Sequence, residues 1–234
     1  MDIYNQDKTK LVNSVFSKVH KNYDLMNDLM SLGIHRLWKM NLISWMNPQP
    51  ENKIIDVASG TGDLARMISQ KNNNENIFCC VEPNQGMFDT GKKKLRSFTN
   101  IEWYLNSAEK LPFKENTFDF YTISYGIRNV TDINQCLKEA YRVIKPGGRF
   151  FCLEFSKVEN EILNLLYQQY SRLIPLIGKI VVGNEKPYNY LVSSIDKFYN
   201  QNELAGLLRK NNFSNVEFRN LSSGISAIHS GWKI

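Results

Sequence analysis

The chain has 234 residues, of which 42% are hydrophobic and 22% are charged, a composition typical of a folded globular protein. The sequence holds no run of about 18 apolar residues and begins without the apolar core and cleavage site of a secretory signal, so neither a membrane-spanning helix nor a leader is expected. The formal net charge of +6 favours an anionic partner, such as a phosphate, a nucleic acid or a membrane lipid.

The cysteines and histidines of the sequence indicate whether disulfides or a metal site are expected. The four cysteines include no C-x-x-C pair, and most of them fall in strand-like segments, which indicates reduced, buried thiols in an intracellular protein. The three histidines lack the spacing of metal ligands, and we therefore expect no metal site.

Secondary-structure patterns along the chain predict an α/β fold. Residues 1–50 are expected to be mostly helical. From residue 53 onward, short β-branched or aromatic runs alternate with segments of helical periodicity, which predicts a parallel sheet covered on both faces. The strand candidates are residues 53–58, 77–82, 101–105, 118–125 and 149–155. Asp132 is expected to cap the helix that the K-P-G-G sequence ends.

The remainder of the chain departs from this alternation. Residues 157–200 are predicted to form a helical insertion after the fifth strand, and residues 201–234 a final helix and a strand hairpin that closes one sheet edge. We therefore expect a single domain, 1–234, in which residues 1–50 form a helical lid and residues 53–155 form the ligand-binding core.

A glycine-rich turn follows the first strand candidate. Gly60, Gly62 and Ala65 form G-x-G-x-x-A, a variant of the dinucleotide fingerprint, between a strand and a helix. Glu82 ends the next strand about 20 residues further on, where an acid can accept hydrogen bonds from ribose hydroxyls. These features are shared by dinucleotide sites and S-adenosylmethionine (SAM) sites, and both ligands remain open.

Two acids beside the turn favour SAM. Asp63 lies in the first turn of the helix, where it would compete with a pyrophosphate for free N–H groups and repel it. Asp56 lies in the preceding strand, and both acids suit the sulfonium and ammonium groups of SAM. The simpler roles are a helix-dipole acid, stabilising by about 0.3–1 kcal/mol, and an acid that orients the turn. The residues 53–155 are thus predicted to be a SAM-binding core.

The loop N-S-A-E-K-L-P-F, residues 106–113, follows the third strand candidate. Ser107 and Ala108 are small and would lie against the edge of an adenine ring. An ordinary surface loop explains the same residues equally well.

The fourth strand leads into S-Y-G-I-R-N-V-T-D, residues 124–132, at the edge where ligands of α/β sheets bind. Arg128 can stabilise an oxyanion, and Asn129 can orient an oxygen. A ring carbon becomes nucleophilic when a neighbouring phenol loses its proton, and a guanidinium near that oxygen favours the phenolate. Arg128 and Asn129 would suit such an acceptor; the alternative pairs Arg128 with a surface acid such as Asp132.

Several segments resemble a known family. Y-D-L-M-N-D-L-M-S-L-G-I-H-R-L-W-K (23–39) and R-V-I-K-P-G-G-R-F-F-C-L-E-F-S (142–156) are similar to the two signature segments of the ubiquinone/menaquinone biosynthesis C-methyltransferases. D-V-A-S-G-T-G-D, I-S-Y-G-I-R-N-V-T-D, L-V-S-S-I and G-I-S-A-I-H-S-G-W-K also match in order, so the resemblance covers nearly the whole chain. It implies a seven-stranded Rossmann-like sheet and SAM-dependent methylation of the ring of polyprenylated quinol precursors, a benzoquinol or a demethylmenaquinol.

The resemblance also assigns residues by position. The SAM contacts of the family fall on Thr61, Glu82, Ser107, Ala108 and Ser124. Glu82 stands where many members have Asp, and it keeps the ribose-binding chemistry with one more methylene. The I-R-N segment belongs to the reacting site of the family, which supports Arg128 and Asn129. We further hypothesise that Tyr23 and His35 face the quinol and that His35 takes a proton.

The prenyl tail of such a substrate needs an apolar route. Residues 173–183, L-I-P-L-I-G-K-I-V-V-G, are the most apolar stretch outside the sheet, and Lys179 and Lys186 lie beside it. We hypothesise peripheral contact with an anionic membrane, against the alternative of a core helix. A homodimer or a quinone-synthesis complex is also open.

The remaining expectations concern competing functions and location. A SAM methyltransferase acting on RNA or protein fits the basic charge, but an N-P-P-Y-type loop is missing and we expect no nucleic-acid partner. A non-catalytic scaffold is a third possibility that the intact site residues disfavour. We expect a bacterial cytoplasmic enzyme at the inner membrane, or alternatively a protein of the matrix side of the mitochondrial inner membrane.

Overall fold

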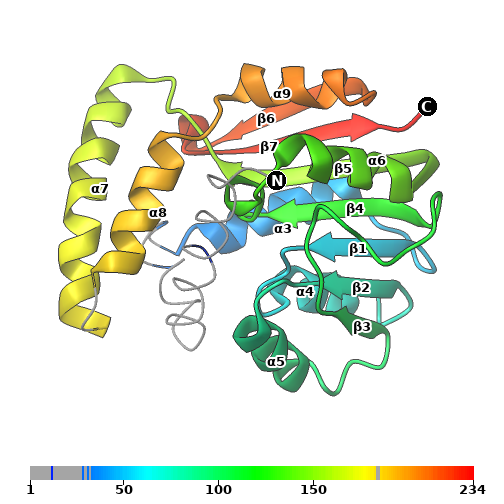
Figure 1. Cartoon of the computed structure of the whole chain (residues 1–234). Helices are drawn as coiled ribbons and strands as arrows, with labels where there is room; N and C mark the ends of the chain where they lie inside the picture. The colour runs from blue at the N-terminus through cyan, green and yellow to red at the C-terminus, as the bar shows by residue number, and fades with distance from the viewer. Residues whose placement is uncertain (1–11, 13–27, 29–30, 32, 183–184) are drawn as a thin grey trace.

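A computed structural model describes residues 12, 28, 31, 33–182 and 185–234, and these form an α/β fold around one seven-stranded sheet (Figure 1). The strands are β1 (Lys53–Val57), β2 (Ile77–Val81), β3 (Ile101–Tyr104), β4 (Phe118–Ser124), β5 (Ile144–Phe155), β6 (Ser214–Leu221) and β7 (Ser226–Trp232). Their order is β3-β2-β1-β4-β5-β7-β6; β1 to β5 pair in parallel, and β7 is antiparallel to both of its neighbours. The predicted α/β class is confirmed, and the last two strands form the hairpin expected at one sheet edge.

Helices cover both faces of the sheet because alternate strand residues are apolar on both sides. The helices are α3 (His35–Met46), α4 (Asp63–Lys71), α5 (Gln85–Lys94), α6 (Ile133–Val143), α7 (Glu161–Val182), α8 (Lys186–Asp196) and α9 (Gln201–Lys210). Ile54 and Phe151 belong to a core shared with α3, α4 and α8, whereas the adjacent Ile55 and Phe150 belong to a second core shared with α6 and α9. Most of the segment 1–50 lies outside the described residues.

The two helices that follow β5 lie beside the sheet and not over it. Figure 1 shows α7 and α8 beyond the carboxyl ends of β1, β2 and β4, with α8 between α7 and the sheet. The apolar segment 173–183 falls mostly in the second half of α7, where Ile174 is buried and a Cβ at Gly178 would lie 2.3 Å from the ring of Tyr188 on α8. One side of α7 therefore packs closely on α8.

Short-range features of the sequence determine where α6 begins and how β5 follows it. Asp132 accepts a hydrogen bond from the backbone N–H of Gln135 over 3.0 Å and caps α6 as expected. The strand after it begins earlier than the predicted residue 149, because Ile144 already pairs with Phe118 on β4. The pairing then jumps from residue 144 to residue 149, so the K-P-G-G residues form an irregularity within β5.

The cysteines agree with the expectation from their positions. Cys79, Cys80, Cys136 and Cys152 are free and buried. Burial raises the pKa of the Cys79 and Cys136 thiols to about 12, so both are protonated and unreactive near neutral pH.

Candidate active site

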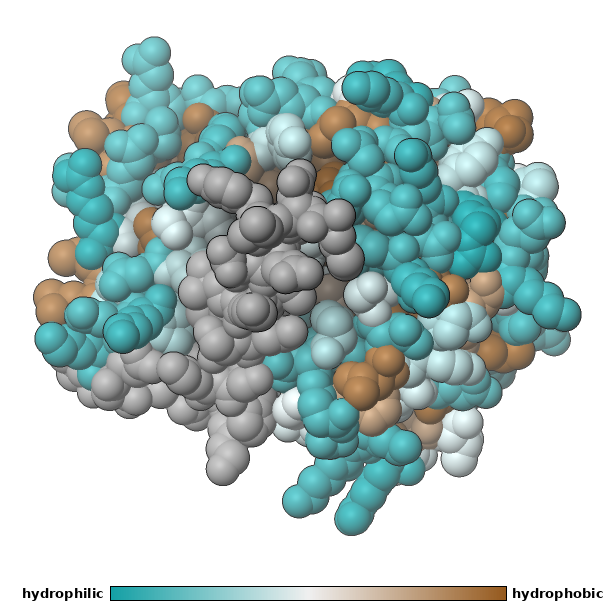
Figure 2. Space-filling model, viewed as in Figure 1, coloured by the Kyte–Doolittle hydropathy of each residue, from teal (hydrophilic) through white to brown (hydrophobic). Residues whose placement is uncertain are grey.

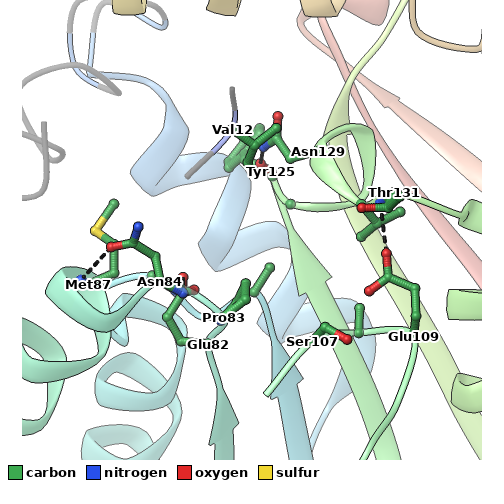
Figure 3. Close-up of a pocket in the computed structure, with 15 residues that line it drawn as sticks. Val12, Glu82, Pro83, Asn84, Met87, Ser107, Glu109, Tyr125, Asn129 and Thr131 are labelled. Carbon is green, nitrogen blue, oxygen red and sulfur yellow. Dashed lines mark hydrogen bonds between the residues drawn. The ribbon is translucent and has the colours of Figure 1, made fainter. Parts of the chain in front are cut away.

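A cavity of about 110 Å³ opens where the carboxyl ends of β1, β2 and β4 meet (Figure 3). Ligands of open α/β sheets bind at this edge, because adjacent crossovers diverge there and leave a crevice. The cavity is lined by Val12, Ala58, Gly60, Glu82, Pro83, Asn84, Met87, Ser107, Ala108, Glu109, Tyr125, Gly126, Asn129, Val130 and Thr131. The structure thus brings together Gly60, Glu82, Ser107, Ala108 and Asn129, all predicted from the sequence.

Glu82 holds the start of the glycine-rich turn in place. One carboxylate oxygen accepts a hydrogen bond from the N–H of Gly60 over 2.9 Å, and the other accepts from the N–H of Asn84 over 2.9 Å. Each oxygen keeps a lone pair for a further donor, such as a ribose hydroxyl. Burial raises the pKa of Glu82 to about 7, although both N–H donors oppose the rise.

A second, smaller cavity of about 20 Å³ adjoins the first. It is lined by Lys39, Asp56, Ala58, Ser59, Thr61, Asp63, Leu64, Ser124 and Tyr125. Ala58 and Tyr125 line both cavities, and both have positive φ, 53° and 56°, which is a strained conformation for residues other than glycine. The predicted residues Asp56, Thr61 and Ser124 therefore gather in this smaller cavity.

Asp56 is almost fully buried at the end of β1. Its Oδ1 accepts a hydrogen bond from the hydroxyl of Thr122 on β4 over 2.7 Å. Burial raises the pKa of Asp56 to about 7, and the nearby positive charge of Lys39 opposes the rise. A bound cationic group would therefore favour the charged form of this carboxyl.

Asp63 lies in the first turn of α4, as expected, and also forms two ion pairs. Its carboxylate contacts the ammonium of Lys39 over 3.2 Å and that of Lys94 over 3.0 Å. These two cations hold the pKa of Asp63 well below its usual range, although burial opposes them. Neither pair was predictable from the sequence, since the partners lie 24 and 31 residues away along the chain.

Gly62 directly precedes α4 and does not line either cavity. Its φ is +80°, and a Cβ would lie 2.6 Å from Cδ1 of Leu95 and 2.9 Å from the ring of Trp103. Both the backbone conformation and the close approach require glycine here. Gly62 thus shapes the turn by packing.

Ser124 leaves an unused polar atom in the smaller cavity. Its hydroxyl is buried and has no hydrogen-bond partner among the residues that the structure describes. Buried hydroxyls are normally paired, so this atom points to a ligand. SAM fits the whole set, since Glu82 suits its ribose, Ser107 and Ala108 its adenine, and the acids its cationic groups.

Arg128 lies in a short 3-10 helix (Ile127–Asn129) after β4 but does not line either cavity. Its guanidinium Nη1 donates to a carboxylate oxygen of Glu154 over 2.6 Å and to the carbonyl of Tyr125 over 2.7 Å. Both charged side chains are almost fully buried. The partner is therefore Glu154 on β5, and not a surface acid such as Asp132.

Asn129 faces the larger cavity, and a residue of helix α8 holds its side chain in place. Its Oδ1 accepts a hydrogen bond from the phenol of Tyr190 on α8 over 2.9 Å. Its side-chain nitrogen lies 3.4 Å from the carbonyl of Tyr125. Tyr190 was missed in the sequence, because it lies 61 residues from its partner.

The remaining predicted catalytic residues lie apart from the cavities or outside the described part. Tyr23 is not among the described residues. His35 is buried at the start of α3, with Nε2 2.9 Å from a carboxylate oxygen of Asp28 and Nδ1 without a partner among the described residues. Burial lowers the pKa of His35, so the ring is neutral near neutral pH.

The cavity also contains residues that sequence reasoning missed. Asn84 accepts a hydrogen bond from the N–H of Met87 over 3.1 Å and caps α5 (Figure 3). A residue of capping type three residues after the end of β2 was a signal that could have found it. Glu109 accepts from the N–H of Thr131 over 2.7 Å and joins the loops after β3 and β4.

Solved structures of similar shape share the fold of this chain. A SAM-dependent methyltransferase of Thermotoga maritima, a possible histamine N-methyltransferase, matches with a TM-score of 0.64 at 20% identity, over 94% of this chain and 100% of that one. Phosphoethanolamine N-methyltransferase 2 of Haemonchus contortus, in complex with S-adenosyl-L-methionine, matches with a TM-score of 0.63 at 12% identity, over 84% of this chain and 52% of that one. These likenesses show the methyltransferase fold, and the geometry of the site fits the same cofactor.

Sequence similarity identifies the family to which the chain belongs. The ubiE/COQ5 methyltransferase family matches residues 3–233. Ubiquinone/menaquinone biosynthesis C-methyltransferase UbiE of Rickettsia bellii (strain OSU 85-389) is 50% identical over 235 residues, 97% of this chain and 94% of that protein. The UbiE of Brucella suis biovar 1 is 47% identical, over 97% of this chain and 87% of that protein. The chain belongs to the ubiE/COQ5 methyltransferase family and is a SAM-dependent C-methyltransferase, as its signature segments indicated.

Proposed function

We propose that the chain transfers the methyl group of SAM to a ring carbon of a polyprenylated quinol precursor, 2-polyprenyl-6-methoxy-1,4-benzoquinol or demethylmenaquinol. The observation that carries the proposal is the position of Asn129, whose amide lines the cavity that also contains Glu82. An acceptor that contacts Asn129 would lie next to a cofactor whose ribose contacts Glu82. Family membership favours this acceptor class over RNA or protein.

For this reaction the protein must position the acceptor beside the methyl donor and stabilise the charge on the acceptor oxygen. SAM supplies an electrophilic methyl group, and the acceptor oxygen must lose its proton so that the ortho carbon can attack; a proton then leaves that carbon. Asn129 would orient the acceptor oxygen through its amide. Arg128 lines neither cavity, but its buried Nε has no partner among the described residues and would be the atom that serves the oxygen or a water molecule.

The direct test is methyl transfer from labelled SAM to short-chain forms of both quinols, with tRNA as a parallel acceptor. We expect mass spectrometry to find one added methyl on a ring carbon, and the ratio of the two products to identify the pathway. Labelled tRNA without quinol product would overturn the proposal. SAM binding without any methylated product would favour a non-catalytic scaffold.

A surface on α7 supports membrane contact. Ile162, Leu165, Leu166, Leu173 and Leu176 are between 52% and 74% exposed. Their spacing places them on one side of the helix, and we call this set the apolar stripe. Figure 2 shows hydrophobic surface at the margin occupied by α7, among hydrophilic residues. Exposed apolar residues in a row are typical of an interaction surface.

The charges beside the stripe indicate an anionic lipid surface. Arg172 and Lys179 are exposed and seven residues apart, so they lie along one edge of the stripe. Basic residues bordering an apolar helix face are typical of helices that lie in the membrane interface. No helix among the described residues is long and apolar enough to span a bilayer. We propose peripheral attachment to the cytoplasmic face of a bacterial inner membrane, where a prenylated acceptor resides; the matrix face of the mitochondrial inner membrane is the alternative.

A further inference from the structure

We propose that the ammonium of Lys39 binds the carboxylate of the methionine moiety of SAM, making α3 a part of the cofactor site. Lys39 was not assigned a role from the sequence. The inference concerns cofactor binding alone and deepens the proposed function.

Burial of Lys39 is the first observation. Its side chain is only 7% exposed and lines the smaller cavity, next to Asp56 and Thr61. Lysine is rarely buried to this extent unless its charge is paired. Among the described residues, Asp63 is the one carboxylate that forms an ion pair with it, over 3.2 Å.

The charge of that pair is the second observation. Asp63 also contacts Lys94, over 3.0 Å, so two ammonium groups share one carboxylate. Lys94 is 34% exposed, whereas Lys39 is enclosed. The enclosed lysine therefore retains capacity for a second anion, since an ammonium has three N–H donors.

The position of the smaller cavity is the third observation. This cavity, of about 20 Å³, adjoins the larger one, of about 110 Å³, through Ala58 and Tyr125. The amino-acid end of SAM is a zwitterion, which needs one anionic and one cationic partner. Asp56 supplies the first, and Lys39 supplies the second.

The experiment measures binding and needs no methyl acceptor. Isothermal titration calorimetry would compare S-adenosylhomocysteine with decarboxylated S-adenosylhomocysteine, which lacks only the carboxylate. We expect Lys39→Met to weaken binding of the first ligand at least about tenfold, as the loss of a charge-assisted hydrogen bond predicts. Binding of the decarboxylated ligand should change less than about threefold.

Lys94→Met is the matched control, because it removes the other cation beside Asp63 from a side chain that does not line the cavity. We expect it to leave both affinities within about threefold. If Lys39→Met unfolds the protein, the double variant Lys39→Met/Asp63→Asn removes both partners of the buried pair and avoids a lone charge. Equal weakening of both ligands, or of neither, by the Lys39 variants would overturn the proposal. Failure of quinol methylation would leave this result unaffected.

Discussion

The phenol of Tyr190 donates a hydrogen bond to Oδ1 of Asn129, so that helix α8 fixes the amide that faces the larger cavity. The carbonyl of Tyr125 can only accept, which places the side-chain nitrogen of Asn129 on that side and its oxygen toward Tyr190. The phenol thereby determines which way the amide presents its N–H groups. An acceptor oxygen would meet a donor whose orientation depends on α8.

Replacing Tyr190 should therefore impair turnover more than cofactor binding. We expect Tyr190→Phe to lower kcat for the quinol about tenfold, because one hydrogen bond of about 1 kcal/mol or more is lost from the orienting group. The dissociation constant of S-adenosylhomocysteine should stay within about twofold. Tyr199→Phe is the control, since Tyr199 is 40% exposed. An unchanged kcat in Tyr190→Phe would show that the hydrogen bond has no role in orientation.

Variants of the buried pair of Arg128 and Glu154 can distinguish a structural role of the arginine from a chemical one. Arg128→Met leaves Glu154 buried without its cation, which should cost about 3–5 kcal/mol of unfolding free energy. The double variant Arg128→Met/Glu154→Gln should recover most of that loss, as measured by urea denaturation. If Arg128 also acts on the acceptor oxygen, the stable double variant will remain inactive. Recovery of activity together with stability would assign Arg128 a structural role alone.

These long-range pairs mark the limit of prediction from the sequence. The strands were predictable because each is a short apolar or aromatic run, and the cap of α6 because Asp132 and Gln135 are three residues apart. Parallel strands also bring their carboxyl ends to one edge, which is why Gly60, Glu82 and Asn129 could be placed in one site.

Partners that are far apart in the chain carried no such signal. Lys39 and Asp63 meet because α3 and α4 share one apolar core, and Tyr190 reaches Asn129 because α8 lies beyond the end of β4. Neither contact follows from spacing or periodicity. The positions of Arg128 and His35 were likewise not predictable, because burial paired them with Glu154 and Asp28.

Gly62 provides a test of the packing beneath the cofactor turn. Gly62→Ala should lower the free energy of unfolding by about 2 kcal/mol or more, because φ is +80° and the new Cβ would lie 2.6 Å from Leu95. Gly206→Ala is the control, since a Cβ there would meet nothing within 4 Å in the middle of α9. That change should stabilise by up to about 1 kcal/mol. Equal effects in chemical denaturation would contradict the explanation for Gly62.

The raised pKa of Asp56 predicts how stability depends on pH. The folded protein binds a proton at Asp56 up to about pH 7, whereas the unfolded chain releases it near 3.8. The carboxyl is therefore increasingly unfavourable in the folded state as pH rises between these values. Asp56→Asn, which keeps an acceptor for Thr122, should gain stability relative to the parent between pH 5 and pH 8. One pKa unit corresponds to about 1.4 kcal/mol, and we expect at least that gain.

The comparison must be made as a difference, because other groups titrate in the same range. Burial lowers the pKa of His229 to about 4. This residue therefore makes the free energy of unfolding rise with pH between pH 4 and pH 6.5, opposite to the effect of Asp56. Subtracting the parent curve removes this contribution. A flat difference curve for Asp56→Asn would rule out a buried carboxyl with a raised pKa.

The apolar stripe on α7 predicts lipid binding that depends on both apolar contact and charge. Replacing Leu166 and Leu173 together by Gln should reduce flotation with anionic vesicles at least about fivefold, because each exposed leucine contributes apolar area to the interface. Adding salt should weaken binding of the parent protein, since Arg172 and Lys179 act through screened charges. Asn164→Gln, on the same helix but outside the stripe, is the control. Light scattering tests whether a second copy of the chain covers the apolar stripe instead. A parent dimer that becomes a monomer when the leucines are replaced, with no vesicle binding by either form, would assign the stripe to a dimer interface.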